Sequence, residues 1–201
     1  ELTEDSRMTL GEWLDQWLKN IAGTIRPTTL TRYQGAIRIH INPHLGGKPI
    51  AQVTGKDVQK LYDALASHGN QITGKGLASS TIRGIHSMLH EALDAAKQAG
   101  LIPWNPTEEI PAPKFTCKSK QILTDEQLDT FMEAIQKDDI WHDFFYTELT
   151  TGLRRGEICG LKWEDFDEAD GTLKVRRTVH QEKGGKLTTW DTKTAAGTRT
   201  I

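Results

Sequence analysis

Two adjacent arginines and a nearby glutamate, in the segment TGLRRGEICGL over residues 151–161, are the side chains best suited to chemistry. The first turn of a helix exposes unpaired N–H groups and the positive end of the helix dipole, so it favours anions and disfavours cations. Arg154 and Arg155 at such a position therefore indicate a negative ligand. A guanidinium can grip a phosphate with two parallel hydrogen bonds, and Glu157 can orient Arg154 from the same helix face. A simple Arg154–Glu157 ion pair without a ligand is the alternative.

Charge is unevenly distributed along the chain, although the formal net charge is only −2. Between residues 19 and 60, seven basic residues are opposed by one acid, and between residues 174 and 201 seven are opposed by two. Two basic zones in separate halves of the sequence point to an extended polyanion such as nucleic acid. A solvated helix face is the alternative for either zone by itself.

The composition excludes several classes of protein. No apolar run approaches the ~20 residues that a membrane-spanning helix needs, and the start of the chain, ELTEDSRMTL, is not a signal-peptide pattern. We therefore expect a soluble cytoplasmic protein. Cys117 and Cys159 are too few for a disulfide framework and lack zinc-ligand spacing, so we expect buried thiols and no metal site.

The first half of the sequence predicts a helical bundle over residues 1–102. TLGEWLDQWLKNIAG begins with a capping-box pattern, Thr9 followed by Glu12, and continues with apolar residues at helical spacing. The second helix is expected to begin at Pro27 and to end where NPHLGG breaks it. Two further helices, VTGKDVQKLYDALASHG and the serine-capped SSTIRGIHSMLHEALDAAKQAG, complete a four-helix domain.

The polar faces of the second and fourth predicted helices carry small hydroxyl residues and arginine near the helix N-termini. Such ends hold phosphates while side chains reach into the major groove of DNA. A solvated surface is the alternative, and the sequence alone weighs the two evenly. Together with basic residues of the second half, the predicted DNA-binding residues are Arg26, Thr28, Thr29, Arg32, Lys56, Ser80, Thr81, Arg83, His86, Arg155, Arg176 and Arg177.

A proline-rich segment, IPWNPTEEIPAPK, cannot continue a helix and predicts an extended linker over residues 103–114. The second half, residues 115–201, begins with the predicted helix ILTDEQLDTFMEAI, in which Thr124 and Gln127 form a capping box. A second helix, DDIWHDFFYTELTTG, is ended by Gly152, and its expected buried face consists of Ile140, Phe144, Phe145 and Leu149. A third helix follows at the arginines. LKVRRTVH alternates like a half-buried strand, and LTTWDTKTAAGTRTI returns after a glycine turn. The expected fold is mainly α with a small antiparallel β-sheet.

The segment TGLRRGEICGLKWEDFD resembles the first catalytic-arginine motif of the tyrosine site-specific recombinases, the integrases of phages and conjugative transposons. That motif reads T-G-x-R-x-x-E and is followed by a leucine and W-x-D, so Arg154 matches the catalytic arginine. TKTAAGTRTI resembles the hairpin that carries the family's catalytic lysine, which falls on Lys193. The first half resembles the family's SAM-like core-binding domain, so the resemblance covers nearly the whole chain.

This resemblance implies integration of a mobile genetic element by DNA strand cleavage and rejoining through a 3′-phosphotyrosyl intermediate. Arg154 would bind the scissile phosphate, supported by Glu157, and Lys193 would protonate the departing 5′ oxygen. A solvent-exposed loop lysine is the alternative for Lys193. No metal or cofactor is implied. The implied partners are double-stranded DNA, further copies of the chain in a dimer or tetramer, and an excisionase or a host DNA-bending protein. The implied location is the bacterial cytoplasm, at the nucleoid.

The sequence also departs from the family pattern. In the family, the remaining catalytic residues and the nucleophilic tyrosine follow the lysine hairpin, and Tyr33, Tyr62 and Tyr146 all lie on predicted helices before it. We assign the nucleophile to none of them. We expect the catalytic domain to be incomplete and inactive alone. Relatives often carry an arm-site DNA-binding domain before the core-binding domain, and the sequence leaves open whether one precedes residue 1. The alternative function is a non-catalytic DNA-binding fragment or regulator. A helical protein-interaction domain leaves the basic zones unexplained.

Overall fold

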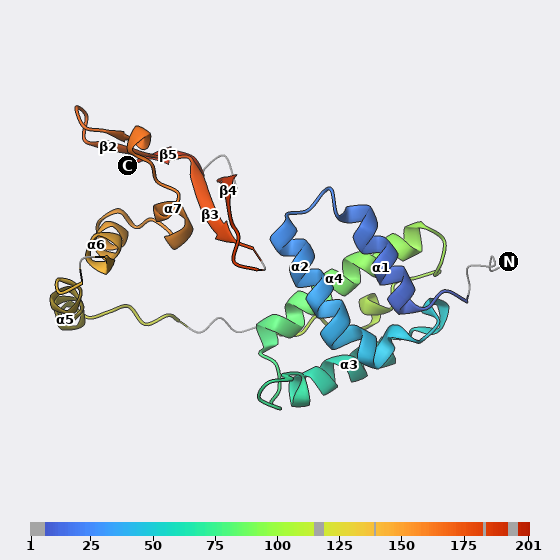
Figure 1. The fold of residues 1–201 in the computed structure, drawn as a ribbon. Coiled ribbons are helices and arrows are strands. Elements are labelled where there is room, and N and C mark those ends of the chain that lie inside the picture. Colours follow the sequence, from blue (N-terminus) through green and yellow to red (C-terminus); the bar gives the residue numbers. More distant parts are fainter. Residues whose placement is uncertain (1–6, 115–118, 139, 183, 193–196) are drawn as a thin grey trace. The chain divides into compact units, whose positions relative to one another are not determined.

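The chain folds into two compact units, Glu1–Lys118 and Ser119–Ile201, each described here by itself (Figure 1). The first unit is helical, and the second combines short helices with two small antiparallel sheets, which confirms the predicted fold class. The computed structural model describes residues 7–114, 119–138, 140–182, 184–192 and 197–201.

The first unit is built on four α-helices joined by shorter helical segments. Its apolar side chains form one buried cluster, to which three of the four helices and the connections contribute, while the second helix packs partly buried residues against it. In chain order the elements are α1 (Leu10–Ile21), α2 (Pro27–Ala36), the π-helix η2 (Ile37–Gly46), the 3-10 helix η3 (Ile50–Gln52), α3 (Gly55–His68), α4 (Ser79–Gln98) and the 3-10 helix η4 (Pro106–Glu109).

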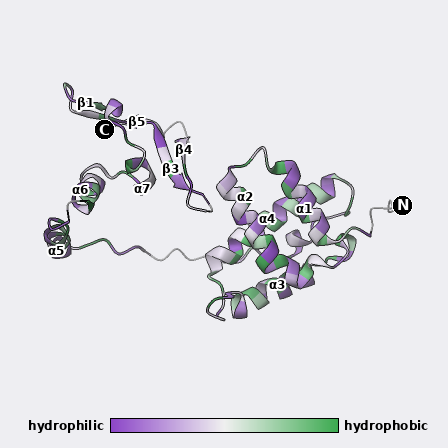
Figure 2. Cartoon of the chain, viewed as in Figure 1, coloured by the Kyte–Doolittle hydropathy of each residue, from purple (hydrophilic) through white to green (hydrophobic). Residues whose placement is uncertain are grey.

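Helix α1 begins with the predicted capping box. The Thr9 hydroxyl accepts the N–H of Glu12 at 3.3 Å, and the Glu12 carboxylate accepts the N–H of Thr9 at 2.8 Å. Its apolar face lies in the core, where Trp13 donates its indole N–H to the carbonyl of Ala92 at 2.8 Å. The alternation of hydrophobic and hydrophilic positions along the helices of this unit is visible in Figure 2. The prediction of a core stripe on this helix is confirmed.

The helical stretch that begins at Pro27 ends within NPHLGG, as expected, but it ends at the glycines and not at the proline. The chain continues from α2 into η2, which runs to Gly46 and contains Pro43. Buried Ile37, Ile41 and Leu45 recur every four residues, so one apolar face continues into the core through this stretch. Proline removes one backbone donor, and the burial of this face offsets that loss.

Helices α3 and α4 complete the bundle. Helix α3 ends before Gly69, as predicted, and the structure shows that Thr54 caps its start. Helix α4 begins at Ser79, but its N-cap is Ala78, which makes no side-chain hydrogen bond, so the predicted serine cap was wrong. The two serines lie inside the first turn, where their hydroxyl groups are exposed instead of capping.

Part of the proline-rich segment packs on the first unit. Residues of η4 contact α3 and α4, and both Thr107 of η4 and Asn105, its N-cap, are buried. The Asn105 amide donates to the carbonyl of His90 at 3.0 Å and to the carboxylate of Asp94 at 2.9 Å, while its oxygen accepts the N–H of Thr107. These contacts fix the direction in which the chain leaves α4.

The second unit contains three short α-helices and five short strands among its described residues. The strands form two sheets, with the order β1-β2-β5 in one and β3-β4 in the other, and every pair is antiparallel. In chain order the elements are α5 (Asp125–Ile135), α6 (Trp141–Thr151), α7 (Arg155–Ile158), the 3-10 helix η5 (Trp163–Asp165), β1 (Phe166–Asp167), β2 (Thr172–Val175), β3 (Arg177–Gln181), β4 (Leu187–Asp191) and β5 (Arg199–Thr200).

The two longer helices of this unit follow their predicted boundaries but bury less than expected. Helix α5 has the predicted capping box, and α6 ends at Gly152 with a φ of 64°, a value that glycine adopts without strain. Phe131 and Phe145 pack edge to face with ring centroids 5.2 Å apart. Ile140, predicted to be buried on α6, is 78% exposed, because it lies at the N-cap outside that aromatic contact.

The predicted single strand LKVRRTVH is two strands that separate at Arg176. Leu173, in β2, pairs with Phe166 of β1, and Val175 pairs with Arg199 of β5. Val179, in β3, pairs instead with Thr189 of β4. Alternation along a sequence predicts an extended chain but does not specify which strand will pair with it, and here the partner changes half-way.

Candidate arginine site and DNA-binding surface

Arg154 and Arg155 lie at the start of α7. Arg154 is the N-cap and Arg155 is the first helical residue, as predicted. Helix α7 has only four residues, so its dipole is small, and the preference for an anion depends on the guanidinium groups themselves. The side chain of Arg154 is 78% exposed. A ligand outside the protein can therefore reach it.

The buried side chain of Glu157 binds Arg154 and orients it. Its side chain is 7% exposed, and its carboxylate accepts the backbone N–H of Arg154 at 3.0 Å and the Arg154 Nη1 group at 2.9 Å. The ion pair that the sequence offered as the alternative to a ligand site is thus present. It restrains the guanidinium without covering it, so the pairing is compatible with a ligand.

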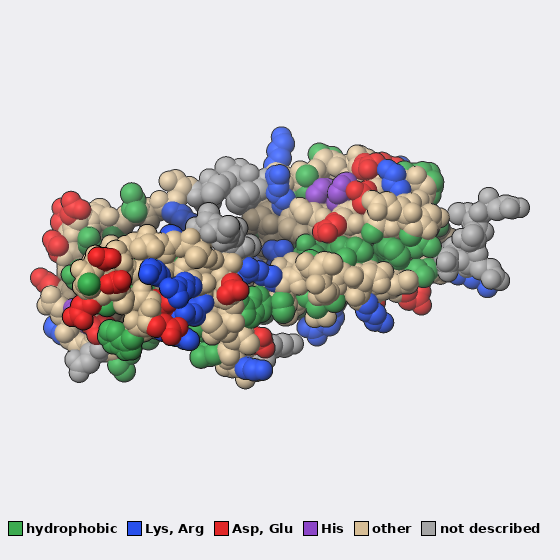
Figure 3. All heavy atoms as spheres, turned by 90° about the horizontal axis from the view of Figure 1, so that it is seen from above, with side chains coloured by type: hydrophobic (Ala, Val, Ile, Leu, Met, Phe, Trp, Pro, Cys, Tyr) green, Lys and Arg blue, Asp and Glu red, His purple; other side chains and the backbone are tan. Residues whose placement is uncertain are grey.

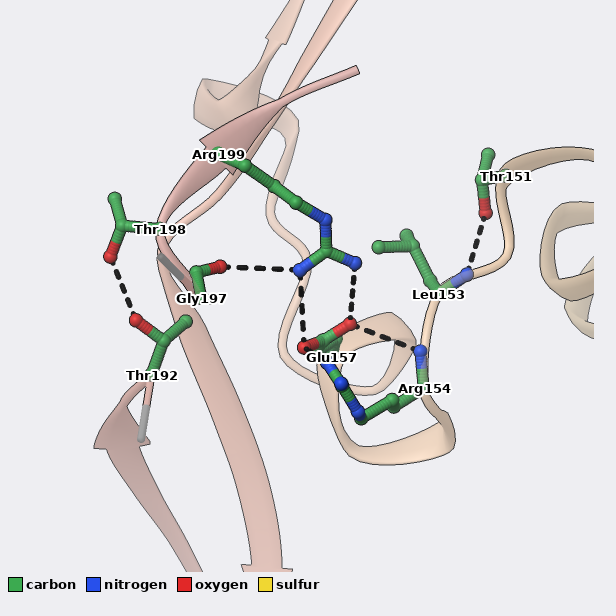
Figure 4. Close-up of polar contacts among 8 residues, drawn as sticks. All are labelled: Thr151, Leu153, Arg154, Glu157, Thr192, Gly197, Thr198 and Arg199. Atoms are coloured by element: carbon green, nitrogen blue, oxygen red, sulfur yellow. Dashed lines mark hydrogen bonds and ion pairs between the residues drawn. The ribbon is translucent and has the colours of Figure 1, made fainter. Parts of the chain in front are cut away.

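Arg199, in β5, contacts the same carboxylate, as Figure 4 shows. Its Nη2 and Nη1 groups lie 3.0 Å and 3.3 Å from the two oxygens of Glu157, and Nη1 also donates to the carbonyl of Gly197 at 3.2 Å. Hydrogen bonding from Arg199, aided by the bonds from Arg154, lowers the pKa of Glu157 from its usual 4.5 to about 2. The same contact raises the pKa of Arg199.

Sequence reasoning counted Arg199 as one charge of a basic zone and assigned it no role. Its partner lies 42 positions earlier in the chain, and nothing in local spacing connects the two. The sequence held one indication of a shared carboxylate, namely that two arginines adjoin a single acid in RRGE. The burial of that acid could not be predicted from the sequence.

A second buried carboxylate, Asp165, holds Arg177. Arg177 Nη2 lies 3.2 Å from Asp165 Oδ1 and 3.1 Å from Glu164 Oε1, and Nη1 donates to the carbonyl of Gly160 at 3.3 Å. The side chain of Asp165 is 1% exposed and that of Arg177 is 15% exposed. The donors of Arg177 are thus used by protein acceptors. Arg176 is 49% exposed and 3.8 Å from the same carboxylate, so it is the more accessible of the two predicted DNA contacts.

Helix α7 lies directly against β3, at two glycines four residues apart. A Cβ atom at Gly156 would lie 2.5 Å from the Thr178 hydroxyl oxygen, and one at Gly160 would lie 3.1 Å from the Arg177 carbonyl oxygen. Larger residues would push the two elements apart. This close approach brings the Arg154 helix next to the β3–β4 hairpin. Figure 3 shows basic and acidic side chains intermixed on one face of this unit.

Lys193, the predicted general acid, lies outside the described residues, as does Cys117. The hydroxyl groups of Thr192 and Thr198, on either side of residues 193–196, are 2.7 Å apart. The role assigned to Lys193 stays a prediction. Cys159, predicted to be buried, is exposed, because it is the C-cap of the short helix α7 instead of a position on its packed face.

In the first unit, a groove of about 460 Å³ separates α2 from α4. Arg32 from α2 and Ser80 and Thr81 from α4 line it, so the structure brings together three of the predicted DNA-binding residues. The Arg32 guanidinium carbon lies 5.4 Å from the centroid of the Tyr33 ring, a geometry that keeps the long side chain on the groove wall. Glycines at positions 35 and 84 leave the groove open.

The other predicted contacts of this unit differ in accessibility. Thr28, Lys56 and Arg83 are exposed, and Arg26 and Thr29 are half-buried at the start of α2. His86 is also half-buried, and its Nδ1 atom lies 2.9 Å from the hydroxyl of Tyr62. Burial, followed by the charges of His90 and Arg83, lowers the pKa of His86, which disfavours a cationic contact there at neutral pH.

The comparisons with known proteins agree with this geometry. The model of the phage integrase N-terminal SAM-like domain matches residues 9–66, and the model of the phage integrase family matches residues 121–198. The chain belongs to the phage integrase family. This membership confirms the resemblance to tyrosine recombinases that the T-G-x-R-x-x-E motif indicated.

Relatives of this integrase-family chain come from bacteria and phages. It is 29% identical to "Tyrosine recombinase XerC-like" of Caldanaerobacter subterraneus, over 89% of this chain and 47% of that protein. It is 26% identical to the integrase of Escherichia phage lambda, over 88% of this chain and 47% of that one. The chain therefore spans about half the length of the curated relatives it matches.

Solved integrase structures share the fold. The Tn1549 transposon integrase in complex with a circular intermediate DNA superposes with a TM-score of 0.80 at 25% identity, over 96% of this chain and 60% of that one. A lambda integrase dimer bound to a COC′ core site gives 0.71 at 25% identity, over 93% and 49%.

No helix within the described ranges is long and apolar enough to cross a membrane. No group of three or more histidine, cysteine and acidic side chains in the described part of the chain is arranged to hold a metal ion.

Proposed function

We propose that this chain takes part in site-specific recombination that integrates a mobile genetic element, by cleaving and rejoining DNA through a 3′-phosphotyrosyl intermediate. Arg154 binds the scissile phosphate in this proposal. The observation that supports it most directly is the state of that side chain, which is oriented by buried Glu157 and yet 78% exposed. A restrained, accessible guanidinium suits a phosphate whose equatorial oxygens gain charge during the reaction.

The proposed reaction is a balanced transesterification. A tyrosine oxygen attacks phosphorus, the bond from phosphorus to the 5′ oxygen breaks, and Lys193 transfers a proton to that departing oxygen. A lysine does this best when neighbouring cations lower its pKa. We assign the nucleophile to none of Tyr33, Tyr62 and Tyr146. Tyr62 is buried, and burial raises its pKa, which disfavours the phenolate.

We further propose that residues 1–102 form a core-binding domain, residues 103–114 a connection, and residues 115–201 the first part of a catalytic domain. Duplex DNA is the proposed partner of the α2–α4 groove, where Arg32, Ser80 and Thr81 meet. Binding should weaken as salt rises, by about 0.9 in log K per neutralised phosphate against log salt. Self-association as a dimer or tetramer on DNA, an excisionase or host DNA-bending partner, and action at the bacterial nucleoid belong to the same proposal.

The test uses a suicide duplex with a nick near the cleavage site, and a protein that carries these 201 residues at the length of its relatives. We expect that protein to be trapped covalently on the duplex. Its Arg154→Ala variant should bind the same duplex but trap poorly, by a factor of about 100 or more. A matched Lys137→Ala variant, which removes an exposed charge outside the arginine site, should trap normally.

Binding with no covalent product in any variant would favour the alternative, a DNA-binding module that does not cut strands. Equal trapping by the Arg154→Ala variant would contradict the role of Arg154.

A further inference from the structure

Two arginines share one buried carboxylate in the second unit. Arg154 and Arg199 both contact Glu157, and the carboxylate is the least exposed of the three side chains, at 7% against 78% and 30%. A single arginine paired with a single carboxylate has no net charge. The three side chains together carry a net charge of +1, so one positive charge stays uncompensated inside the cluster.

The two arginines do not contribute equally to that neutralisation. Arg199 contacts both oxygens of Glu157 through its two terminal nitrogens, at 3.0 Å and 3.3 Å, in the bidentate manner that suits a guanidinium and a carboxylate. Arg154 makes one side-chain bond, at 2.9 Å, and its second contact comes from its backbone N–H. Arg199 is also anchored by the carbonyl of Gly197. Arg199 is thus the fixed counter-ion, and Arg154 is the exposed one.

We propose that Arg199 is a positioning residue that neutralises Glu157, so that Arg154, oriented by the same carboxylate, keeps its positive charge for a DNA phosphate. This inference rests on the proposed function of Arg154. Arg199 itself need not touch DNA in this arrangement.

The physical reason is the cost of a buried charge. A carboxylate removed from water needs a compensating cation, and a lone partner is drawn fully into that pair. Without Arg199, Arg154 would be the sole neighbour left to compensate Glu157 among the contacts described for that carboxylate. The resulting pair would be neutral and would attract a phosphate weakly. Removing the charge of Glu157 as well should then release Arg154 again.

The experiment measures the affinity of the 201-residue chain for a fluorescein-labelled duplex of about 30 base pairs, by fluorescence anisotropy over a range of NaCl concentrations. Arg154→Ala should lower the affinity about tenfold near 0.1 M salt and reduce the slope of log K against log salt by about 0.9. Arg199→Ala should do the same. The double variant Glu157→Gln with Arg199→Ala should recover most of the lost affinity, and Arg199→Lys should stay within about threefold of the unmodified chain. Lys137→Ala is the charge-matched control and should change the affinity less than about twofold.

A purely structural role for Arg199 predicts that the double variant binds DNA no better than Arg199→Ala, because it has lost at least as many contacts. Recovery of affinity in the double variant therefore supports the inference. Affinity unchanged by Arg199→Ala, while Arg154→Ala lowers it, would overturn the inference and leave the proposed function standing. Affinity unchanged by Arg154→Ala would also overturn the inference, whereas normal trapping of that variant on the suicide duplex would overturn the proposed role of Arg154. Circular dichroism checks the fold of each variant. Where Arg199→Ala unfolds the second unit, Arg199→Gln replaces it with the same expected tenfold loss, and full affinity in that variant overturns the inference.

Discussion

Different interactions stabilise the interior of each of the two units of this integrase-family chain. In the first, 23 described apolar residues form one buried cluster. In the second, the described residues include three buried apolar side chains, Ile135, Leu153 and Val175, and two buried carboxylates, Glu157 and Asp165. The comparison teaches that apolar burial specifies the first unit broadly, whereas directional ion pairs connect the segments of the second.

The ion pairs of the second unit lie where the proposed chemistry needs rigid geometry. Arg177, at the start of the β3–β4 hairpin, pairs with Asp165. Arg199, in strand β5 after the hairpin, pairs with Glu157. Arg177 and Arg199 therefore attach the start of β3 and strand β5 to the stretch of chain that carries Arg154. Hydrophobic packing is non-directional and would not fix such a register by itself.

The largest effect is expected in the core of the first unit. Leu89 is fully buried in α4, so Leu89→Ala should lower the free energy of unfolding of this unit by about 4 kcal/mol, through lost transfer energy and the cavity left behind. Urea unfolding gives the magnitude, and hydrogen exchange followed by mass spectrometry assigns it to a unit.

Leu123→Ala, at a leucine that is 55% exposed, is the control and should change stability by about 0.5 kcal/mol or less. Destabilisation of the second unit by Leu89→Ala would break the distinction between the two cores.

A somewhat smaller effect is expected from Asp165→Asn. This change keeps the side-chain size but leaves Arg177 without its buried counter-ion, and should cost about 3 kcal/mol in the second unit. Faster hydrogen exchange in peptides of η5 and β3 measures it. Glu168→Gln, at an exposed acid in the turn after β1, is the matched control. Unchanged exchange would mean that packing, and not the ion pair, holds this unit.

The smallest expected effect is the pH dependence of the stability of the second unit, which tests the contribution of the Glu157 ion pairs. The pKa of Glu157 is about 2 in the folded chain and 4.5 ordinarily, so the folded state stays ionised at pH values where the unfolded chain takes up a proton. The stabilisation is complete above about pH 4.5 and is lost as the pH falls toward 2. The Tm of the second unit should drop by about 5 °C more in this window than that of Glu157→Gln, as scanning calorimetry would measure. Parallel curves for the two proteins would contradict the assignment.

Local signals in the sequence predicted several elements well. Thr9 and Thr124 begin α1 and α5 through capping boxes, and Gly152 ends α6. Each of these signals operates within one turn of a helix, so the residues that decide the outcome are neighbours in the sequence. The apolar spacing of α1 was equally informative, because a helix places such residues on one face regardless of its partners.

Local sequence patterns were poor predictors where the outcome depends on residues that are distant in the sequence. The proline of NPHLGG would end a helix in many contexts, but here burial of Ile41 and Leu45 carries a π-helix through Pro43 to Gly46. Arg177 was predicted to contact DNA from a strand, and the structure places its guanidinium on Asp165 instead, so a phosphate would have to displace those bonds. In each case a tertiary contact outweighed the local preference.

The sequence by itself determined the arginine motif, the helical first half, the threonine caps of α1 and α5, and the family, because these depend on residue type and short spacing. The tertiary structure alone decided that Glu157 is shared between Arg154 and Arg199, and that β2 and β3 belong to different sheets. Contacts across 42 residues form only when the chain folds back on itself, and the energy of a charge depends on how deeply that folding buries it.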